Sequence, residues 1–533
     1  MIYSLTQCST LIVDDFQEMH TLLRGFVKAM GVKVIDDAFN AKEALSMLGS
    51  KKYDIVICDY NLGPGKNGQQ ILEEARLRKY IGYSTIWIMV TAEKTMDMFM
   101  CAAEIKPDDY LLKPINEHIL KSRLNKLIER KQTFSNIENA MKANDYITAI
   151  SLCDEQLKDS SSSAPDILRL KSDLLITTGN LTAAKALFEE VLSTRNAPWA
   201  RLGLGKIHFA SNEFARAKEI FQQALKENRM YLEAADWLAK TLEVTGDTKQ
   251  AQQVLFDATE ISPNASSRQK KLADTAHKNG ALDLAQTAYE KVIKLNEFSV
   301  VKNTNAHMGL AKVLTDKDSP QEAMKILNQC IGEFEGAPEA AMNAAVVQSM
   351  IHQKMGQPEE AKLALKEAER LMDTLSGNAE ADVKMDMAKV LLQLGEKDKA
   401  YGLLESVVKN NHENMGVINQ VEAVFESEGL GSEGKGLIKK FTEEIIEIND
   451  KGVLLAREEK FEEGIKLLRE ALQQLPNNVL FITNLCGMLI GLMMKKGKDD
   501  RLIGEIGKHL EHVREIDPNN KKYYVYINAL SRL

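Results

Sequence analysis

The sequence predicts an α/β domain with a parallel sheet over residues 1–130, followed by an all-α region of helical repeats over residues 131–533. In the first part, short runs rich in Ile and Val alternate with helical patterns of apolar residues. This alternation is typical of a parallel sheet covered by helices on both faces. Past Lys131 the strand signals stop and a 34-residue period begins, which is typical of stacked helical repeats.

Five strands alternating with five helices are expected before residue 131. The strands are expected at residues 8–13, 32–35, 53–58, 85–90 and 110–112. The helices are expected at residues 17–30, 41–48, 69–79 and 95–104, and from 116 to about 131. In a sheet of this kind, ligands bind beyond the carboxyl ends of the strands.

The composition is that of an ordinary soluble protein, with 44% hydrophobic and 27% charged residues. A net charge of −8 disfavours binding to nucleic acid. Six cysteines without a C-x-x-C pair indicate reduced thiols in a reducing compartment. The N-terminus lacks the basic region of a signal peptide, and the most apolar stretch, residues 479–494, is short for a bilayer. We therefore expect a cytoplasmic protein that does not bind a membrane.

Polar residues gather at the expected carboxyl ends of four strands. Asp14 and Asp15 follow the first strand, Asp59 the third, Thr91 the fourth and Lys113 the fifth. Three carboxylates at one edge repel one another unless a cation lies between them, and oxygen ligands favour Mg²⁺. A carboxylate beside a divalent cation can attack phosphorus, while a lysine and a threonine can stabilise phosphoryl oxygens. The pattern indicates aspartyl-phosphate chemistry.

Each of these residues, taken alone, also has an ordinary structural interpretation without a function. One aspartate after a strand is more often a helix cap or part of a solvated turn, so the prediction depends on five matches in register. Tyr53 and Trp87 are expected in the core. Cys58 precedes Asp59 and should point to the opposite face of the sheet as a small buried side chain. Lys113-Pro114 is a candidate cis peptide bond.

Residues 8–130 resemble the receiver domain of the two-component response regulators. Asp14-Asp15, Asp59, Thr91-Ala92, Tyr110 and Lys113-Pro114 occur in the order and spacing of that family. The resemblance implies a flavodoxin-like fold with strand order 2-1-3-4-5. It also implies that Asp59 accepts a phosphoryl group from a histidine kinase or a histidine phosphotransfer protein.

The same resemblance implies a Mg²⁺ site. Asp15, Asp59 and the backbone carbonyl of Asn61 would ligate the ion, with Asp14 supporting it through water. Asn61 and Glu93 occupy positions that in this family tune the access of the hydrolytic water. Their identities resemble those of the faster-hydrolysing members, which implies a short-lived signal.

The resemblance further implies that Thr91 and Lys113 hold the phosphoryl group and that Tyr110 is the aromatic residue that turns inward on activation. The sequence departs from the family pattern in one loop. The loop from Asp59 to Gly68 is one residue longer than in the chemotaxis receivers and carries Gly-Pro-Gly, which we expect to alter kinase docking rather than the chemistry.

The second region repeats every 34 residues. The aligned sets are Leu204, Leu238 and Leu272; Ala217, Ala251 and Ala285; and Phe221, Leu255 and Tyr289. Alternating small and large residues are what packed helix pairs need. The period resembles the tetratricopeptide repeat, and Pro263 falls where that family places its repeat-ending proline. We expect about nine repeats, closed by a capping helix at residues 521–533.

Two local patterns in the second region mimic functional sites. The glycine-rich stretch 429–436 lacks the Ser or Thr that follows the lysine of a phosphate loop, and we expect an ordinary loop there. His509 and His512 share a helix face, but without a third ligand nearby we expect a solvated surface rather than a metal site.

A stack of two-helix repeats has a concave groove suited to a peptide or another domain, so an unknown protein partner is expected there. Lys206 and Lys240 recur at one repeat position that is expected to face the groove. They would favour an acidic partner, although Asp274 interrupts the row at the next copy. Ordinary surface lysines are the alternative interpretation.

The leading hypothesis is a cytoplasmic response regulator whose output is protein binding. No enzyme activity is expected beyond aspartyl self-phosphorylation and dephosphorylation, and a homodimer is compatible with the sequence. Two alternatives are a phosphate sink or scaffold that competes for a kinase and, less favoured, a DNA-binding transcriptional regulator. A third is a repeat-borne enzyme activity, for which the sequence offers no residues.

Overall fold

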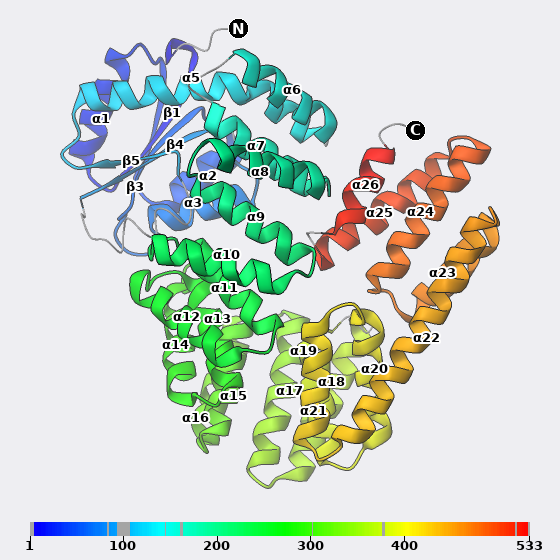
Figure 1. Cartoon of the computed structure of the whole chain (residues 1–533). Helices are drawn as coiled ribbons and strands as arrows, with labels where there is room; N and C mark the ends of the chain where they lie inside the picture. Colours follow the sequence, from blue (N-terminus) through cyan, green and yellow to red (C-terminus); the bar gives the residue numbers. More distant parts are fainter. Residues whose placement is uncertain are drawn as a thin grey trace.

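The computed structural model describes residues 5–82, 85–92, 107–143, 145–159, 164–300, 302–375, 379–517 and 520–530. An α/β domain at the N-terminus is followed by a curved stack of helices (Figure 1). This two-part architecture is the one that the sequence predicts.

The N-terminal domain contains a five-stranded parallel sheet in the order β2-β1-β3-β4-β5. The strands are β1 (Ser9–Val13), β2 (Val34–Ala38), β3 (Ile55–Asp59), β4 (Ile86–Thr91) and β5 (Asp109–Leu112). The predicted strand order is confirmed. All five strands end at the same edge, because parallel strands share one direction.

Helices cover both faces of this sheet. They are α1 (Gln17–Ala29), α2 (Ala41–Ser50), α3 (Gly68–Leu77) and α5 (Glu117–Lys142), preceded by the 3₁₀ turn η1 (Leu5–Gln7). Successive strand residues point to opposite faces. Ile57 therefore packs with α1 and α5, while Cys58 packs with α2 and α3. The helix predicted at 95–104 lies outside the described residues, as does Glu93.

The second strand differs from its prediction. It begins at Val34 rather than residue 32 and continues through Asp36 and Asp37 to the edge of the site. Asp36 accepts hydrogen bonds from Lys51 and Tyr53, which compensates its charge at the edge of the sheet. These partners are distant in sequence, so the local pattern gave no reason to extend the predicted strand beyond residue 35.

The last helix of the N-terminal domain is longer than expected. It runs to Lys142 rather than to about residue 131, and Lys131 on it lies 3.5 Å from Asp54 through Nζ and Oδ1. The predicted domain boundary between residues 130 and 131 would therefore fall inside one continuous helix, and it remains a proposal. This helix, rather than a linker, joins the two regions.

The second region consists of helices. They are α6 (Tyr146–Asp159), α7 (Ala164–Thr177), α8 (Leu181–Thr194), α9 (Pro198–Ala210), α10 (Phe214–Glu227), α11 (Leu232–Val244), α12 (Thr248–Ile261), α13 (Ser266–Lys278), α14 (Leu282–Leu295), α15 (Asn305–Asp316), α16 (Pro320–Glu333), α17 (Pro338–Lys354), α18 (Pro358–Thr374), α19 (Ala381–Gln393), α20 (Lys397–Asn411), α21 (Met415–Ser427), α22 (Gly431–Arg457), α23 (Phe461–Gln474), α24 (Val479–Lys496), α25 (Asp500–Ile516) and α26 (Lys521–Leu530).

Small and large residues alternate at the helix crossings, as the 34-residue pattern predicts. Phe221 is fully buried, and a Cβ added to Gly205 would lie 2.5 Å from its ring. A Cβ added to Gly309 would lie 2.3 Å from the ring of Tyr289. The glycines are required because these helix pairs approach too closely for any side chain.

The glycine-rich stretch at 429–436 is not the expected loop. Only Glu428, Gly429, which is in the left-handed region at φ 73°, and Leu430 separate α21 from α22, and α22 begins at Gly431. A Cβ added to Gly434 would lie 2.4 Å from the ring of Phe425, so this glycine permits close helix packing. Tertiary packing overrides the low helix propensity of glycine here.

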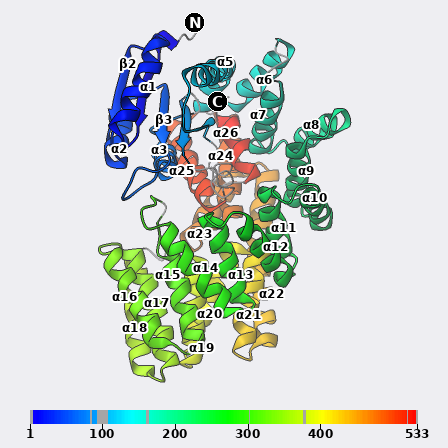
Figure 2. The ribbon, with the colours of Figure 1, turned by 90° about the vertical axis from the view of Figure 1, so that its left-hand side faces the viewer.

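The repeats curve so that the C-terminal helices return toward α9 and α11 (Figures 1 and 2). Helix α24 is long and apolar enough to cross a membrane by length and composition, and half of it is buried inside the structure. Residues of α24 and α26 line the same cavity as Trp199 and Trp237, which lie more than 240 residues earlier in the chain.

Candidate functional site

Three carboxylates meet at the carboxyl edge of the sheet. The ligand oxygens of Asp14, Asp15 and Asp59 lie within 4.8 Å of one another. β1 and β3 are neighbours and Val13 stands opposite Cys58, which places the next residues, Asp14 and Asp59, side by side. Asp14 and Asp59 are buried, whereas Asp15 is exposed. The cluster is thus open to solvent on one side only.

Lys113 reaches this cluster from the end of β5. Its Nζ donates to Asp14 Oδ2 at 2.9 Å and to Asp59 Oδ2 at 3.0 Å. The predicted cis peptide bond between Lys113 and Pro114 is present. Asp14 also accepts a hydrogen bond from the backbone N–H of Phe16 at 2.9 Å through Oδ1. The lysine therefore joins two buried carboxylates that would otherwise repel each other.

Burial and charge oppose each other at these groups. Burial raises the pKa of the Asp59 carboxyl, Asp14 adds to that rise, and the hydrogen bond and charge of Lys113 act against it. Burial lowers the pKa of Lys113, but its hydrogen bonds to the two carboxylates outweigh burial and leave that pKa above its ordinary value. Lys113 therefore stays charged at neutral pH.

The charge and the oxygen donors fit a divalent cation. Three carboxylates and one ammonium leave two negative charges in a cluster whose oxygens are near enough to share an ion. The loop after β3 passes beside the cluster, because a Cβ added to Gly63 would lie 3.7 Å from Asp15 Oδ2. Asn61 belongs to this loop, and its side-chain Oδ1 accepts from the N–H of Gly63 at 3.3 Å.

Thr91 and Tyr110 lie where the strand order predicts. Thr91 is buried at the end of β4, and its carbonyl accepts a hydrogen bond from the N–H of Lys113 at 2.8 Å. Tyr110 stands opposite Met89 in β5, and its half-buried side chain packs with the apolar residues beneath α2 and α3. The threonine thus borders the cluster, and the tyrosine borders the neighbouring core.

The side chains next to the site occupy the positions expected of core residues. Cys58 is fully buried among the apolar residues beneath α2 and α3, and burial raises the pKa of its thiol. Trp87 belongs to the same core. The Tyr53 hydroxyl donates to Asp36 Oδ2 at 2.8 Å.

Sequence reasoning missed two residues that hold the site in place. His20 is buried in α1, and its ring nitrogens lie 2.7 Å from the backbone oxygen of Asp14 and 3.0 Å from Asp37 Oδ1. A single histidine in a helical pattern gives no signal of such a role. Gly68 begins α3, and an added Cβ would lie 2.1 Å from the backbone oxygen of Asp59.

A signal for the position of Gly68 was present in the sequence. Asn67 and Gln70 form a reciprocal capping box at the start of α3, with the spacing typical of a helix start. Lys66 pairs with the buried Glu74, and Arg78 Nε lies 2.7 Å from the other oxygen of Glu74. The long loop after Asp59 is therefore fixed to the helix that follows it.

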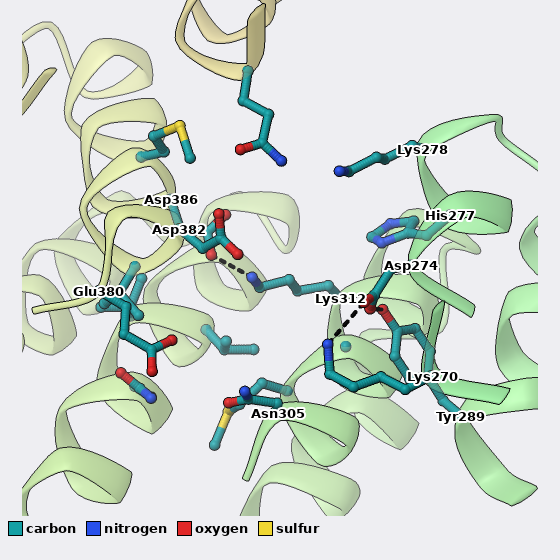
Figure 3. A pocket seen from close by; sticks show the side chains of 18 of the residues that line it. Lys270, Asp274, His277, Lys278, Tyr289, Asn305, Lys312, Glu380, Asp382 and Asp386 are labelled. Carbon is teal, nitrogen blue, oxygen red and sulfur yellow. Dashed lines mark hydrogen bonds and ion pairs between the residues drawn. The ribbon is translucent and has the colours of Figure 1, made fainter. Parts of the chain in front are cut away.

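Two cavities between described helices of the repeats are lined by residues of the predicted row. Lys206 and Lys240 line one of 970 Å³, together with Trp237. Asp274 lines a second of 330 Å³ (Figure 3). All three residues of the predicted row thus face cavities.

Comparison with known families separates the chain into the same two parts. Residues 10–125 match the response regulator receiver domain. Residues 175–241 and 208–276 match the tetratricopeptide repeat, and residues 271–298 match a second model of that repeat.

Two relatives resemble the N-terminal part. Chemotaxis protein CheY of Pseudomonas aeruginosa is 32% identical over 120 residues, which cover 22% of this chain and 95% of that protein. Chemotaxis protein CheY-3 of Vibrio cholerae is 31% identical over 120 residues, covering 22% of this chain and 91% of that protein.

Two solved structures are also similar to parts of the chain. A two-component response regulator from Clostridium difficile is 28% identical, with a TM-score of 0.21, covering 24% of this chain and 98% of its own. A tetratricopeptide repeat protein from Parabacteroides merdae is 15% identical, with a TM-score of 0.33, covering 49% of this chain and 98% of its own.

Proposed function

The chain belongs to the response regulators, with a receiver domain followed by tetratricopeptide repeats, and we propose that its repeats bind a protein partner under control of a phosphoryl group on Asp59. A histidine kinase or a histidine phosphotransfer protein supplies that group. The observation that carries the proposal is the buried Asp59 carboxylate, joined by Lys113 to Asp14 at the edge of the sheet.

The chemistry assigns a role to each side chain. A carboxylate oxygen of Asp59 attacks the phosphorus of the donor phosphohistidine, and the P–N bond breaks with its electron pair returning to the imidazole. An acyl phosphate forms on Asp59. Lys113 then pairs with a phosphoryl oxygen instead of the bare carboxylate, and the Thr91 hydroxyl donates a hydrogen bond to another.

The residues that would hold Mg²⁺ are Asp15, Asp59 and the backbone carbonyl of Asn61, with Asp14 acting through water. When bound, the ion neutralises charge on the phosphoryl oxygens. The exposed carboxylate of Asp15 leaves an open path to this position, while the burial of Asp14 and Asp59 limits the access of bulk water.

Two physical connections support control of the repeats by the receiver. Helix α5 passes from one to the other without a break. In addition, α3 contacts the end of α14 and the segment after it: Gln70 Nε2 donates to the Leu295 carbonyl at 3.4 Å, and the Ser299 hydroxyl donates to Glu73 Oε2 at 3.5 Å. Since α3 starts against the backbone of Asp59, a change at the site bears directly on this contact.

Phosphorylation of the full chain by acetyl phosphate and Mg²⁺ tests the site. We expect one added phosphoryl group by intact-protein mass spectrometry and none on Asp59→Ala. Asp36→Asn removes a carboxylate from β2 at the far edge of the sheet and should be labelled like the wild type. Label retained on Asp59→Ala would refute the assignment.

Partner capture by the repeats separates this function from the phosphate-sink alternative. A partner bound by the full chain should be retained to a different extent after phosphorylation, and this difference should vanish in Asp59→Ala. Identical capture in both states would leave the sink as the only role for the receiver.

A further inference from the structure

Hydrogen bonds lead from the Asp59 carboxylate through the loop that follows β3. The backbone N–H of Tyr60 is shared between two acceptors, Asp59 Oδ1 at 2.9 Å and the Val90 carbonyl at 2.8 Å. The Tyr60 carbonyl in turn accepts from the backbone N–H of Gly68 at 2.8 Å. Gly68 is the first residue of α3. Tyr60 therefore joins the phosphoacceptor side chain to the start of α3.

The side chain of Gln70 continues this path from α3 to the repeats. Its Oε1 accepts from the N–H of Asn67, the residue that caps α3, at 3.1 Å, and its Nε2 donates to the Leu295 carbonyl at 3.4 Å. Leu295 is the last residue of α14, where carbonyls lack a partner within the helix. The two ends of a planar amide point in fixed directions. Gln70 can therefore make both bonds only while the start of α3 and the end of α14 keep their present positions.

A second contact lies one turn further along the same face of α3. There the Ser299 hydroxyl donates to Glu73 Oε2 at 3.5 Å. Burial raises the pKa of the Glu73 carboxyl, and the hydrogen bond from Ser299 acts in the opposite direction. The bonds from Gln70 and Ser299 both lie at the long end of the hydrogen-bond range, so a small movement of α3 is enough to break them.

Phosphorylation changes the first bond of the path. One carboxylate oxygen of Asp59 forms the new bond to phosphorus, the P–N bond of the donor breaks, and the negative charge of the carboxylate passes to the phosphoryl oxygens. Whichever oxygen reacts, the N–H of Tyr60 then faces a neutral acceptor in place of a charged one. A hydrogen bond to an ionised acceptor is about twice as strong as one to a neutral acceptor. The loop after β3 therefore loses part of its attachment to Asp59.

We infer that phosphorylation of Asp59 loosens the contact of α3 with the end of α14, and that the Gln70 side chain carries the effect. The inference rests on the proposed function, because it specifies how the phosphoryl group acts on the repeats. Coupling between two sites is reciprocal. Separation of α14 from α3 therefore favours the phosphorylated form of the receiver.

Hydrogen–deuterium exchange of the full chain, followed by mass spectrometry, tests the inference. We expect acetyl phosphate and Mg²⁺ to accelerate exchange at residues 293–300 about five-fold. This factor corresponds to about 1 kcal/mol, the difference between hydrogen bonds to a charged and to a neutral acceptor. Asp59→Asn also presents a neutral acceptor to Tyr60, so it should accelerate exchange at these residues without any phosphoryl donor.

Gln70→Glu breaks only the last bond of the path. The glutamate can still accept from the N–H of Asn67, but it cannot donate to the Leu295 carbonyl. Exchange at residues 293–300 should already be fast in this variant, and phosphorylation should change it less than two-fold. The control Gln321→Glu makes the same change at an exposed position in the first turn of α16 and should respond to phosphorylation like the wild type.

The intact mass of each sample shows whether Asp59 carries the phosphoryl group. Unchanged exchange at residues 293–300 in a labelled sample would overturn the inference and leave the assignment of Asp59 intact. A Gln70→Glu chain that responds like the wild type would also overturn it. If Asp59 is not labelled, the proposed function fails, and Asp59→Asn still decides the inference: accelerated exchange supports it, and wild-type exchange refutes it.

Discussion

Replacing Gly68 with alanine tests whether the start of α3 must lie against the phosphoacceptor strand. The new Cβ would lie 2.1 Å from the backbone oxygen of Asp59, 2.9 Å from Cys58 Sγ and 3.0 Å from Met89 Sδ. A side chain can rotate away from such a clash, but a backbone oxygen in a buried strand cannot. The strand or the helix must therefore move, and Asp59 moves with it.

The size of the effect follows from two opposing contributions. Overpacking at the upper end of its usual range costs about 3 kcal/mol, and alanine regains at most about 1 kcal/mol of helix propensity, so the net loss is about 2 kcal/mol. Gly25 is the matched control, because it is exposed in α1 and an added Cβ meets nothing within 4 Å. Gly25→Ala should therefore stabilise the domain by about 1 kcal/mol.

Urea unfolding reports these changes through Trp87, the tryptophan of the receiver, in a background with Trp199→Phe and Trp237→Phe. At about 2 kcal/mol per molar urea, Gly68→Ala should lower the midpoint by about 1 M and Gly25→Ala should raise it by about 0.5 M. Gly68→Ala should also slow labelling by acetyl phosphate. Equal midpoints and equal labelling rates in the two variants would refute the proposed role of this contact.

Three further predictions concern the metal, the thiols and the pH response. Asp15→Asn should reduce the stabilisation of the folded chain by Mg²⁺. For the wild type, this stabilisation reaches about 2.7 kcal/mol at a Mg²⁺ concentration a hundred times the Kd of the site. If Mg²⁺ raised the urea midpoint of the variant as much as that of the wild type, Asp15 would not be a ligand. In a Cys101→Ser background, which removes the cysteine that lies outside the described residues, the five remaining thiols should react slowly with a disulfide reagent until the chain unfolds. All five are buried, and burial raises the pKa of Cys486 to about 12; rapid native labelling would contradict this. Burial and Lys302 lower the pKa of His307, so the unfolded chain binds the proton first and the repeats lose stability as the pH falls through the unfolded value of about 6.5. His307→Leu should make the urea midpoint less sensitive to pH in this range, and an equal sensitivity would show that another group titrates.

The edge of the sheet could be predicted because its signals are local. β1 and β3 each end where a carboxylate appears, so Asp14 and Asp59 mark both the strand ends and the site. β2 lacked such a signal. The predicted strand ended at residue 35, before Asp36 and Asp37, and only their partners Lys51 and Arg24 explain why the strand continues.

The other features that the sequence did not predict depend on packing between residues that are far apart in the chain. The start of α22 was hidden because glycines lower helix propensity, yet Gly434 is needed against Phe425. The 34-residue period correctly placed Lys206 and Lys240 toward a cavity. It could not place Val479 across from them, because that position depends on small rotations accumulated over many repeats.

The two connections between receiver and repeats differ in how readily they can switch. The α5 connection is a continuous helix, and interrupting it costs several backbone hydrogen bonds at once. Among the described contacts of α3 with the end of α14 and the segment after it, the hydrogen bonds from Gln70 and Ser299 are long, and each is worth about 1 kcal/mol or less.

A change of one or two kcal/mol alters an equilibrium by a factor of about 5 to 30. A small movement of α3 is therefore enough to shift the fraction of molecules in which α3 contacts the repeats. Glu73 adds to this sensitivity, because burial at the contact raises the pKa of its carboxyl and a buried carboxylate tolerates little loss of its Ser299 partner. With Gly68 held against Asp59, the α3 contact is the weaker connection and the one nearer to the chemistry. If Asp59 is phosphorylated as proposed, the α3 contact is therefore the connection through which the effect would reach the repeats first.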